Sequence, residues 1–134
     1  MLAGSVDTNI LVRLLTQDDV QQAQAVDRLL ARHVKNGDML FVPITVVLEL
    51  EWVLRSRLAL DKADVIQAMS ALLTMVELSF ESEGALEQAL VDYQEGGADF
   101  GEYIHLALSR SHHALPFWTF DRKAAKATGA KVLT

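Results

Sequence analysis

Acidic side chains recur in this sequence beside the ends of apolar segments. Asp7 follows the apolar residues LAGSV, and Asp121 follows LPFWTF. Asp99 and Glu102 lie three residues apart at the start of GADFGEYIHLALSR, so they share one face of the first turn if this stretch is helical. Carboxylates that converge repel one another unless cations neutralise them, and oxygen ligands select hard ions such as Mg²⁺ or Mn²⁺. Such ions usually serve phosphate chemistry.

A further acid, Glu49, lies inside the apolar run VVLELEWVL. Because its neighbours are apolar, either Glu49 or Glu51 is expected to point toward a partly buried place, where a carboxylate is costly without a cation. Glu49 caps no helix, and only Arg55 and Arg57 stand near it in sequence as ion-pair partners. We therefore interpret Glu49 as a candidate site residue.

A structural role competes with the functional one for the other acids. Asp7, Asp99 and Asp121 each precede a predicted helix, and an aspartate is a favoured helix N-cap. Taken singly, each of them is explained by capping. The sequence alone leaves both roles open, and the occurrence of the whole set favours a functional site.

The elements that would position these acids alternate along the chain. The pattern predicts strands at residues 2–6, 39–43, 76–80, 115–120 and 130–134, and helices at 7–16, 18–36, 44–58, 61–75, 82–95, 97–110 and 121–128. Alternating strands and helices favour an α/β fold of three layers, in which a central, mainly parallel sheet carries helices on both faces. Sites in such folds usually lie beyond the carboxyl ends of the strands.

Composition sets the class of protein. The chain has 134 residues, which favours a single domain over residues 1–134, and it has no cysteine. Its net charge of −6 argues against a broad basic surface for nucleic acid, although bound cations would make an acidic pocket locally positive. Without a signal-like or membrane-spanning segment, a cytoplasmic location is expected. The apolar fraction of 51% suggests a surface buried against a partner.

Four motifs in order, VDTNILVRLL, VVLELEWVL, ADFGEYIHLALSR and TFDRKAAK, resemble the PIN-domain ribonucleases, and among them the VapC-type toxins. The resemblance implies a PIN-like fold and a Mg²⁺- or Mn²⁺-dependent endoribonuclease. It implies a catalytic, metal-binding set of Asp7, Glu49, Asp99 and Asp121. Asn9, Glu102 and Thr119 are expected to support that set. The resemblance also implies a homodimer whose toxicity a cognate antitoxin neutralises.

One motif departs from the family pattern. Many relatives read DFADA where this chain reads DFGEY, so Glu102 replaces a second aspartate. The longer side chain keeps the charge but moves it outward, which leaves open whether Asp99 or Glu102 is the principal ligand. After Asp121, the compact basic cluster of Arg122, Lys123 and Lys126 is expected either to contact RNA phosphates or to form a solvated face.

Other polar and aromatic residues are given structural roles. His105, His112 and His113 are interpreted as polar residues near the end of a helix, because adjacent side chains on a helix do not point the same way. Trp52 and Trp118 lie in apolar runs, which favours the core or an interface over base stacking.

Two alternative functions remain open from the sequence. One is a PIN-fold protein-binding module without catalysis, and the full set of acids argues against it. The other is a Mg²⁺-binding regulatory domain of the receiver kind, which needs an acceptor aspartate after a central strand. The segment VELSFESEG supplies no aspartate there.

Overall fold

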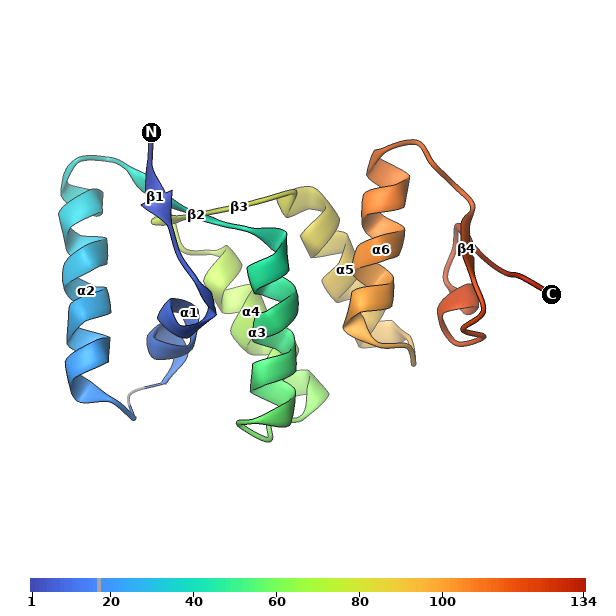
Figure 1. The fold of residues 1–134 in the computed structure, drawn as a ribbon, viewed down its shortest axis with the longest axis horizontal. Coiled ribbons are helices and arrows are strands. Elements are labelled where there is room, and N and C mark those ends of the chain that lie inside the picture. Colours follow the sequence, from blue (N-terminus) through green and yellow to red (C-terminus); the bar gives the residue numbers. More distant parts are fainter. Residues whose placement is uncertain (17) are drawn as a thin grey trace. The chain divides into compact units, whose positions relative to one another are not determined.

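The computed structural model describes residues 1–16 and 18–134. Contacts divide the chain into two compact units, Met1–Glu81 and Ser82–Thr134, and each is described by itself. The path of the chain through the elements of each unit can be followed in Figure 1. In the described part of the chain, the helices are all too short or too polar to cross a membrane.

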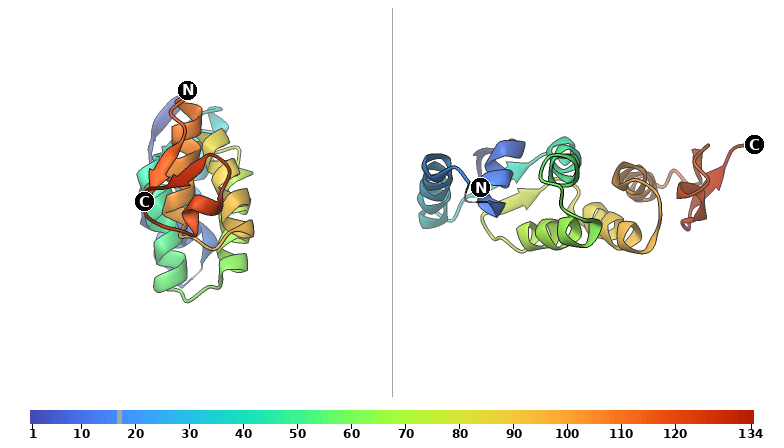
Figure 2. Two further views of the ribbon diagram at one scale, coloured as in Figure 1. Left: turned by 90° about the vertical axis from the view of Figure 1, so that its right-hand side faces the viewer. Right: turned by 90° about the horizontal axis from the view of Figure 1, so that it is seen from below.

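The first unit combines a parallel sheet with helices. Its elements are β1 (Leu2–Ser5), α1 (Thr8–Leu15), α2 (Val20–Lys35), β2 (Met39–Val42), α3 (Ile44–Ser56), α4 (Lys62–Leu73) and β3 (Leu78–Phe80). The strands are hydrogen-bonded in the order β1-β2-β3, and both pairings are parallel. In the right-hand view of Figure 2, α1 and α3 lie on one side of this sheet and α4 on the other.

Local sequence explains where these helices begin. Asp7, Asp19 and Asp61 occupy the N-cap positions of α1, α2 and α4, and each carboxylate accepts a hydrogen bond from the backbone N–H three residues later. Such bonds satisfy amides that the first helical turn leaves without partners. Pro43 ends β2 and stands at the N-cap position of α3.

The core of the first unit comes from one face of each helix and from the sheet. Its most completely buried side chains include Leu11, Val42, Val47, Leu50, Leu54 and Val65. On α2 the apolar residues Ala23, Val26 and Leu30 are buried, whereas Val34 near the end of the helix is exposed. Burial of this apolar face is what stabilises these helices against the sheet.

The second unit is a helix pair followed by a small sheet. Its elements are α5 (Glu83–Glu95), α6 (Phe100–Ser111), β4 (Phe117–Thr119), the 3₁₀ helix η1 (Ala124–Lys126) and β5 (Ala130–Val132). The helices α5 and α6 pack closely, and β4 pairs with β5 in parallel. Tyr93 of α5 contacts Phe100 and Tyr103 of α6, with ring centroids 5.3 and 6.3 Å apart.

The α/β fold with parallel strands that the alternation predicts is therefore confirmed, with differences in detail. Among the described residues the strands pair as a three-stranded and a two-stranded sheet, one in each unit. The helix predicted over 121–128 is wrong in extent, because only Ala124–Lys126 forms a 3₁₀ turn. The chain leaves the turn at Ala127 in an extended conformation, and Gly129 then adopts a φ of +96° that glycine tolerates.

The two tryptophans do not belong to the core, which corrects one of the two structural roles predicted for them. Trp52 is 48% exposed and Trp118 is 56% exposed. The guanidinium of Arg57 lies over the Trp52 ring, and the ammonium group of Lys131 lies over that of Trp118. The apolar runs mislead here because each contains a helix or strand with one face turned away from the core.

Candidate functional site

In the first unit, α1 and α3 bring two of the candidate acids into one neighbourhood. Asp7 is exposed immediately beyond β1, and its Oδ1 atom accepts the N–H of Ile10 at 3.2 Å. The next residue, Thr8, is buried, and its hydroxyl donates to Oε1 of Glu49 on α3. This contact joins the start of α1 to the middle of α3.

Of the two glutamates in this run, Glu49 is the one whose carboxylate is open to solvent and could bind a cation. Glu51 is only 4% exposed, and Arg55, one helical turn later, donates to it from Nε at 2.9 Å. Glu49 is exposed and has Thr8 as its partner. The cation expected near the buried acid therefore serves Glu51, and Glu49 is left facing solvent.

A groove of about 530 Å³ between α1 and α2 adjoins Asp7. Asn9 is exposed on its rim, and Arg13 contributes a guanidinium that donates to Gln22 at 2.6 Å and to Asp18 at 3.0 Å. The hydrogen bond from Thr16 and the charge of Arg13 lower the pKa of Asp18. Sequence reasoning missed Arg13, although its position six residues after Asp7 on an amphipathic helix was a usable signal.

In the second unit, Asp99 and Glu102 begin α6. Asp99 occupies the N-cap position, but its side chain makes no capping hydrogen bond within the described structure. Capping therefore does not explain the Asp99 carboxylate, which corrects that alternative. The backbone N–H of Glu102 donates to the Asp99 carbonyl at 3.0 Å, and the Glu102 side chain is partly exposed.

Asp121 lies directly beyond β4 and is held by short-range contacts. Its Oδ1 atom accepts the N–H groups of Lys123 at 2.8 Å and Ala124 at 3.0 Å. Its own N–H donates to the hydroxyl of Thr119 at 3.0 Å. Thr119 thus fixes the backbone at Asp121, and Asp121 fixes the start of the basic segment.

Capping and cation binding are compatible at these positions, because a carboxylate has two oxygens. For Asp7 and Asp121, the bonds from backbone amides all go to Oδ1. The second oxygen, Oδ2, accepts no bond from the described residues. Together with the uncapped Asp99, each of these three aspartates thus keeps at least one oxygen for a cation.

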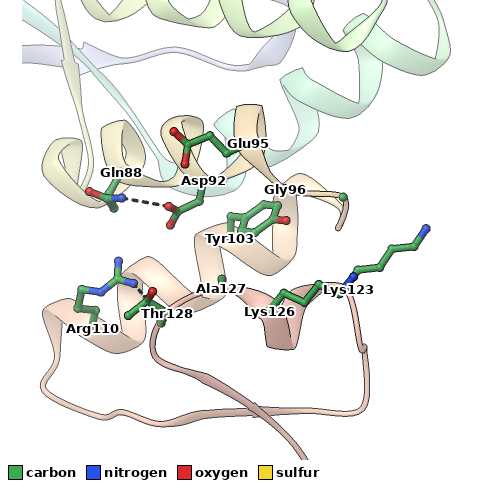
Figure 3. A pocket seen from close by; sticks show the side chains of 11 residues that line it. Gln88, Asp92, Glu95, Gly96, Tyr103, Arg110, Lys123, Lys126, Ala127 and Thr128 are labelled. Carbon is green, nitrogen blue, oxygen red and sulfur yellow. Dashed lines mark hydrogen bonds between the residues drawn. The ribbon is translucent and has the colours of Figure 1, made fainter.

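The three basic residues after Asp121 do not all lie at the same place in the second unit. Lys123 and Lys126 line a cavity of about 620 Å³ in the second unit, whereas Arg122 is exposed outside it. Figure 3 shows the side chains that line this cavity, with Asp92 and Gln88 from α5 and Arg110 from α6. Sequence reasoning missed Asp92, Tyr103 and Arg110, because nothing in their local sequence distinguishes them from an ordinary helix surface.

The candidate acids offer the kind of ligand atom that binds divalent cations. All candidate ligands are carboxylate oxygens, as Mg²⁺ and Mn²⁺ prefer. Within the described residues, no three acidic, imidazole or thiol side chains gather into a group that could hold a metal ion. Mg²⁺ is commonly held by only one or two carboxylates and keeps several waters, so a pair of acids is compatible with it.

His112 and His113 are polar residues at the C-terminal end of α6, as the sequence predicts, whereas the prediction is wrong for His105, which lies in the middle of α6. His105 is exposed with its ring 6.1 Å from that of Phe117, and His112 is the C-cap residue. His113 follows with a φ of +55°.

Comparison with known proteins identifies one family. The family model described as the PIN domain matches residues 5–130. A search of curated proteins finds no match for this chain.

Proposed function

The chain belongs to the PIN domain family, whose members are generally nucleases, and from this premise we propose that it is a metal-dependent endoribonuclease and the toxin of a toxin–antitoxin pair. The proposal covers residues 1–134 as one functional domain. It takes RNA as the substrate and Mg²⁺ or Mn²⁺ as the cofactor.

The observation that carries the proposal is the state of the aspartates. Asp7 and Asp121 stand two residues after the ends of parallel strands with one carboxylate oxygen unused, and Asp99 stands at a helix start without capping it. The structural caps Asp19 and Asp61 also accept through Oδ1 alone, so what distinguishes Asp7 and Asp121 is their place after the ends of parallel strands, and what distinguishes Asp99 is the lack of a capping bond. The resemblance of the sequence motifs to the family implies a catalytic role for the same residues.

Each candidate residue receives a role. Asp7, Glu49, Asp99 and Asp121 are the acids to which we assign metal binding, with Glu102 as an additional acid on α6. Thr8 orients Glu49, and Thr119 holds the backbone of Asp121. Asn9 supports Asp7 from the exposed start of α1, and Arg122, Lys123 and Lys126 contact RNA phosphates.

When bound, the divalent ion supplies Lewis-acid polarisation of the phosphate and a more acidic water for attack on phosphorus. The chain contributes position and charge. Its lysines attract the RNA backbone, which an unneutralised acidic surface would repel. The hydrogen bonds to Asp121 and Glu49 hold these carboxylates in place before the substrate arrives, so little reorganisation is needed.

The test compares Asp7→Asn with Asp19→Asn. Both aspartates are N-caps whose Oδ1 accepts an amide three residues later, at 3.2 and 3.0 Å, and asparagine caps about as well as aspartate. We expect Asp7→Asn to lose nearly all Mg²⁺-dependent RNA cleavage, while Asp19→Asn stays active and both melt near the wild-type temperature.

Equal activity in the two variants would reduce Asp7 to a cap and refute the catalytic assignment. Purified wild-type protein that cleaves no cellular RNA with Mg²⁺ or Mn²⁺ would refute the nuclease proposal and favour the binding-module alternative.

The partner assignment has its own support. The groove beside Asp7 is lined by Ile10, Ala25, Val26 and Leu29 as well as by polar residues, so it offers an apolar surface next to an acid. We infer that the protein acts in the cytoplasm as a homodimer, and that the antitoxin binds an apolar surface and places a basic side chain near the acids. A cation among unneutralised carboxylates gains more than an exposed ion pair does.

Sedimentation at micromolar concentration tests the dimer, and a monomer without self-association would refute it. Overproduction in the native host tests the toxin assignment. If the overproduced protein cleaves RNA but does not slow the growth of the host when no partner is present, the toxin assignment is refuted and the nuclease proposal stands.

A further inference from the structure

The cavity of the second unit holds a charge pattern that the proposed cleavage chemistry does not use. One wall comes from α5, with Gln88, Asp92 and Glu95, and another from the segment 123–128, with Lys123 and Lys126. In Figure 3, Asp92 points from α5 toward the segment that carries Ala127 and Thr128. A hydrogen bond of 2.9 Å from Arg110 to the Thr128 carbonyl ties this segment to α6.

Asp92 has an unused hydrogen-bonding capacity in this cavity. Its Oδ1 atom accepts from Nε2 of Gln88 at 3.1 Å. Its Oδ2 atom is buried and accepts no hydrogen bond from any described residue. Because a buried acceptor without a partner costs free energy, a ligand that donates a hydrogen bond to this oxygen would gain that free energy.

The opposite wall supplies positive charge that the protein does not neutralise. Within the described residues neither Lys123 nor Lys126 forms an ion pair. The Lys123 stem passes 3.8 Å from the place where a side chain on Gly97 would begin. Asp99 and Asp121 do not line the cavity, but each lies two residues from a residue that does, Gly97 and Lys123, and the Lys123 N–H donates to Asp121.

From this arrangement we propose that the cavity binds one nucleotide of the RNA substrate and selects its base. Lys123 and Lys126 bind the phosphate, and Asp92, positioned by Gln88, accepts a hydrogen bond from an exocyclic amino group. A volume of about 620 Å³ suits a ligand of nucleotide size. Carboxylates accept from the amino group of cytosine, whereas uracil presents a carbonyl oxygen at that position. The proposal rests on the proposed RNA-cleaving function.

The experiment measures fluorescence anisotropy of the full chain with short labelled oligocytidine and oligouridine, in EDTA so that neither is cleaved. We expect wild-type protein to prefer oligocytidine. Asp92→Asn lowers the affinity for oligocytidine about tenfold and does not lower that for oligouridine, because an amide N–H₂ in the place of Oδ2 donates a hydrogen bond and no longer accepts one. Glu87→Gln is the matched control, since Glu87 is an exposed acid of α5 outside the cavity and its substitution changes the charge equally.

The lysine wall is tested in the same assay. Lys126→Gln weakens both oligonucleotides and lowers the slope of affinity against salt by about 0.7, as expected for one lost phosphate contact on a single strand. The control is Lys131→Gln, because Lys131 lies on β5 outside the cavity.

A measurement on wild-type protein tests base selection without any substitution, so it remains valid if a variant fails to fold. Oligocytidine methylated twice on N4 has no amino donor, so it should bind as weakly as oligouridine. Equal binding of the methylated and unmethylated strands overturns base selection at Asp92 while the nuclease proposal stands. Failure of wild-type protein to bind either RNA, with no cleavage of cellular RNA in Mg²⁺, overturns both.

Discussion

Replacing Gly96 by alanine should lower the stability of the fold strongly, although it adds only one methyl group. Gly96 is the C-cap of α5, and a Cβ atom built there would lie 1.9 Å from the hydroxyl oxygen of Tyr103 and 2.8 Å from its Cζ atom. Tyr103 is 2% exposed to solvent, and it also lines the cavity of the second unit. Its hydroxyl also accepts the buried N–H of Ala98 at 3.0 Å.

The magnitude for Gly96→Ala follows from these two contacts. Forcing a methyl group into a packed core typically costs about 1–3 kcal/mol. If Tyr103 shifts, the buried N–H of Ala98 loses its acceptor, which costs about 1–3 kcal/mol more. We expect the free energy of unfolding to fall by about 2–6 kcal/mol, and the melting temperature by at least about 6 °C for a chain of this size.

The matched control is Gly84→Ala. Gly84 lies in the first turn of α5, and a Cβ atom there would meet no atom within 4 Å beyond its chain neighbours and the backbone of its own helix. Alanine favours a helix over glycine by up to about 1 kcal/mol, so this variant should melt at or above the wild-type temperature. Calorimetry or circular dichroism on both variants gives the comparison.

A double-variant cycle identifies the cause. Tyr103→Phe removes the atom nearest to the new methyl group, so Gly96→Ala should cost at least about 1 kcal/mol less in that background than in the wild type. Additive costs, or equal melting temperatures for Gly96→Ala and Gly84→Ala, would show that the close approach to Tyr103 does not constrain Gly96.

Three further outcomes are expected. Asp61→Ala should lower the free energy of unfolding by about 1 kcal/mol in urea denaturation, because it removes the capping bond to the Asp64 N–H; no change would mean that α4 is held by packing alone. Asp99→Asn should cost more cleavage activity than Glu102→Gln on one RNA at saturating Mg²⁺, and the reverse order would make Glu102 the principal ligand. Chelation by EDTA should abolish cleavage, and added Mn²⁺ should restore it; cleavage that persists in EDTA would contradict a divalent cofactor.

The sequence by itself determined most of the local structure. Asp19 and Asp61 cap helices because the bond from an N-cap carboxylate spans only three residues and needs no distant partner. The alternation of apolar segments determined the parallel pairing, because two parallel strands require a long crossover between them. Asp7 and Asp121 follow strands for the same local reason.

The sequence also indicated the family, because its motifs are contiguous and occur in order. It could not show how far the last predicted helix extends. Residues DRKAAKAT have good helical composition, yet the backbone leaves the turn after Lys126. Propensity summed over so few residues is too weak to hold a helix without packing.

Tertiary structure alone decided how the candidate acids are used. Glu49 and Glu51 lie in the same apolar run, and the packing of α3 against α1 and α4 buries Glu51 and leaves Glu49 exposed beside Thr8. Local sequence predicts a cap at Asp99, whereas the side chain makes none.

The cavity at Asp92 depends on tertiary structure most completely. Its walls come from α5, α6 and the segment 123–128, which are separated along the chain and meet only on folding. The constraint on Gly96 also arises only on folding. The hydroxyl of Tyr103 occupies the space that a side chain on Gly96 would need, and the residues next to Gly96 in sequence do not reveal this. Short-range hydrogen bonds are encoded by residue spacing, whereas a shared cavity is decided by the packing of whole elements.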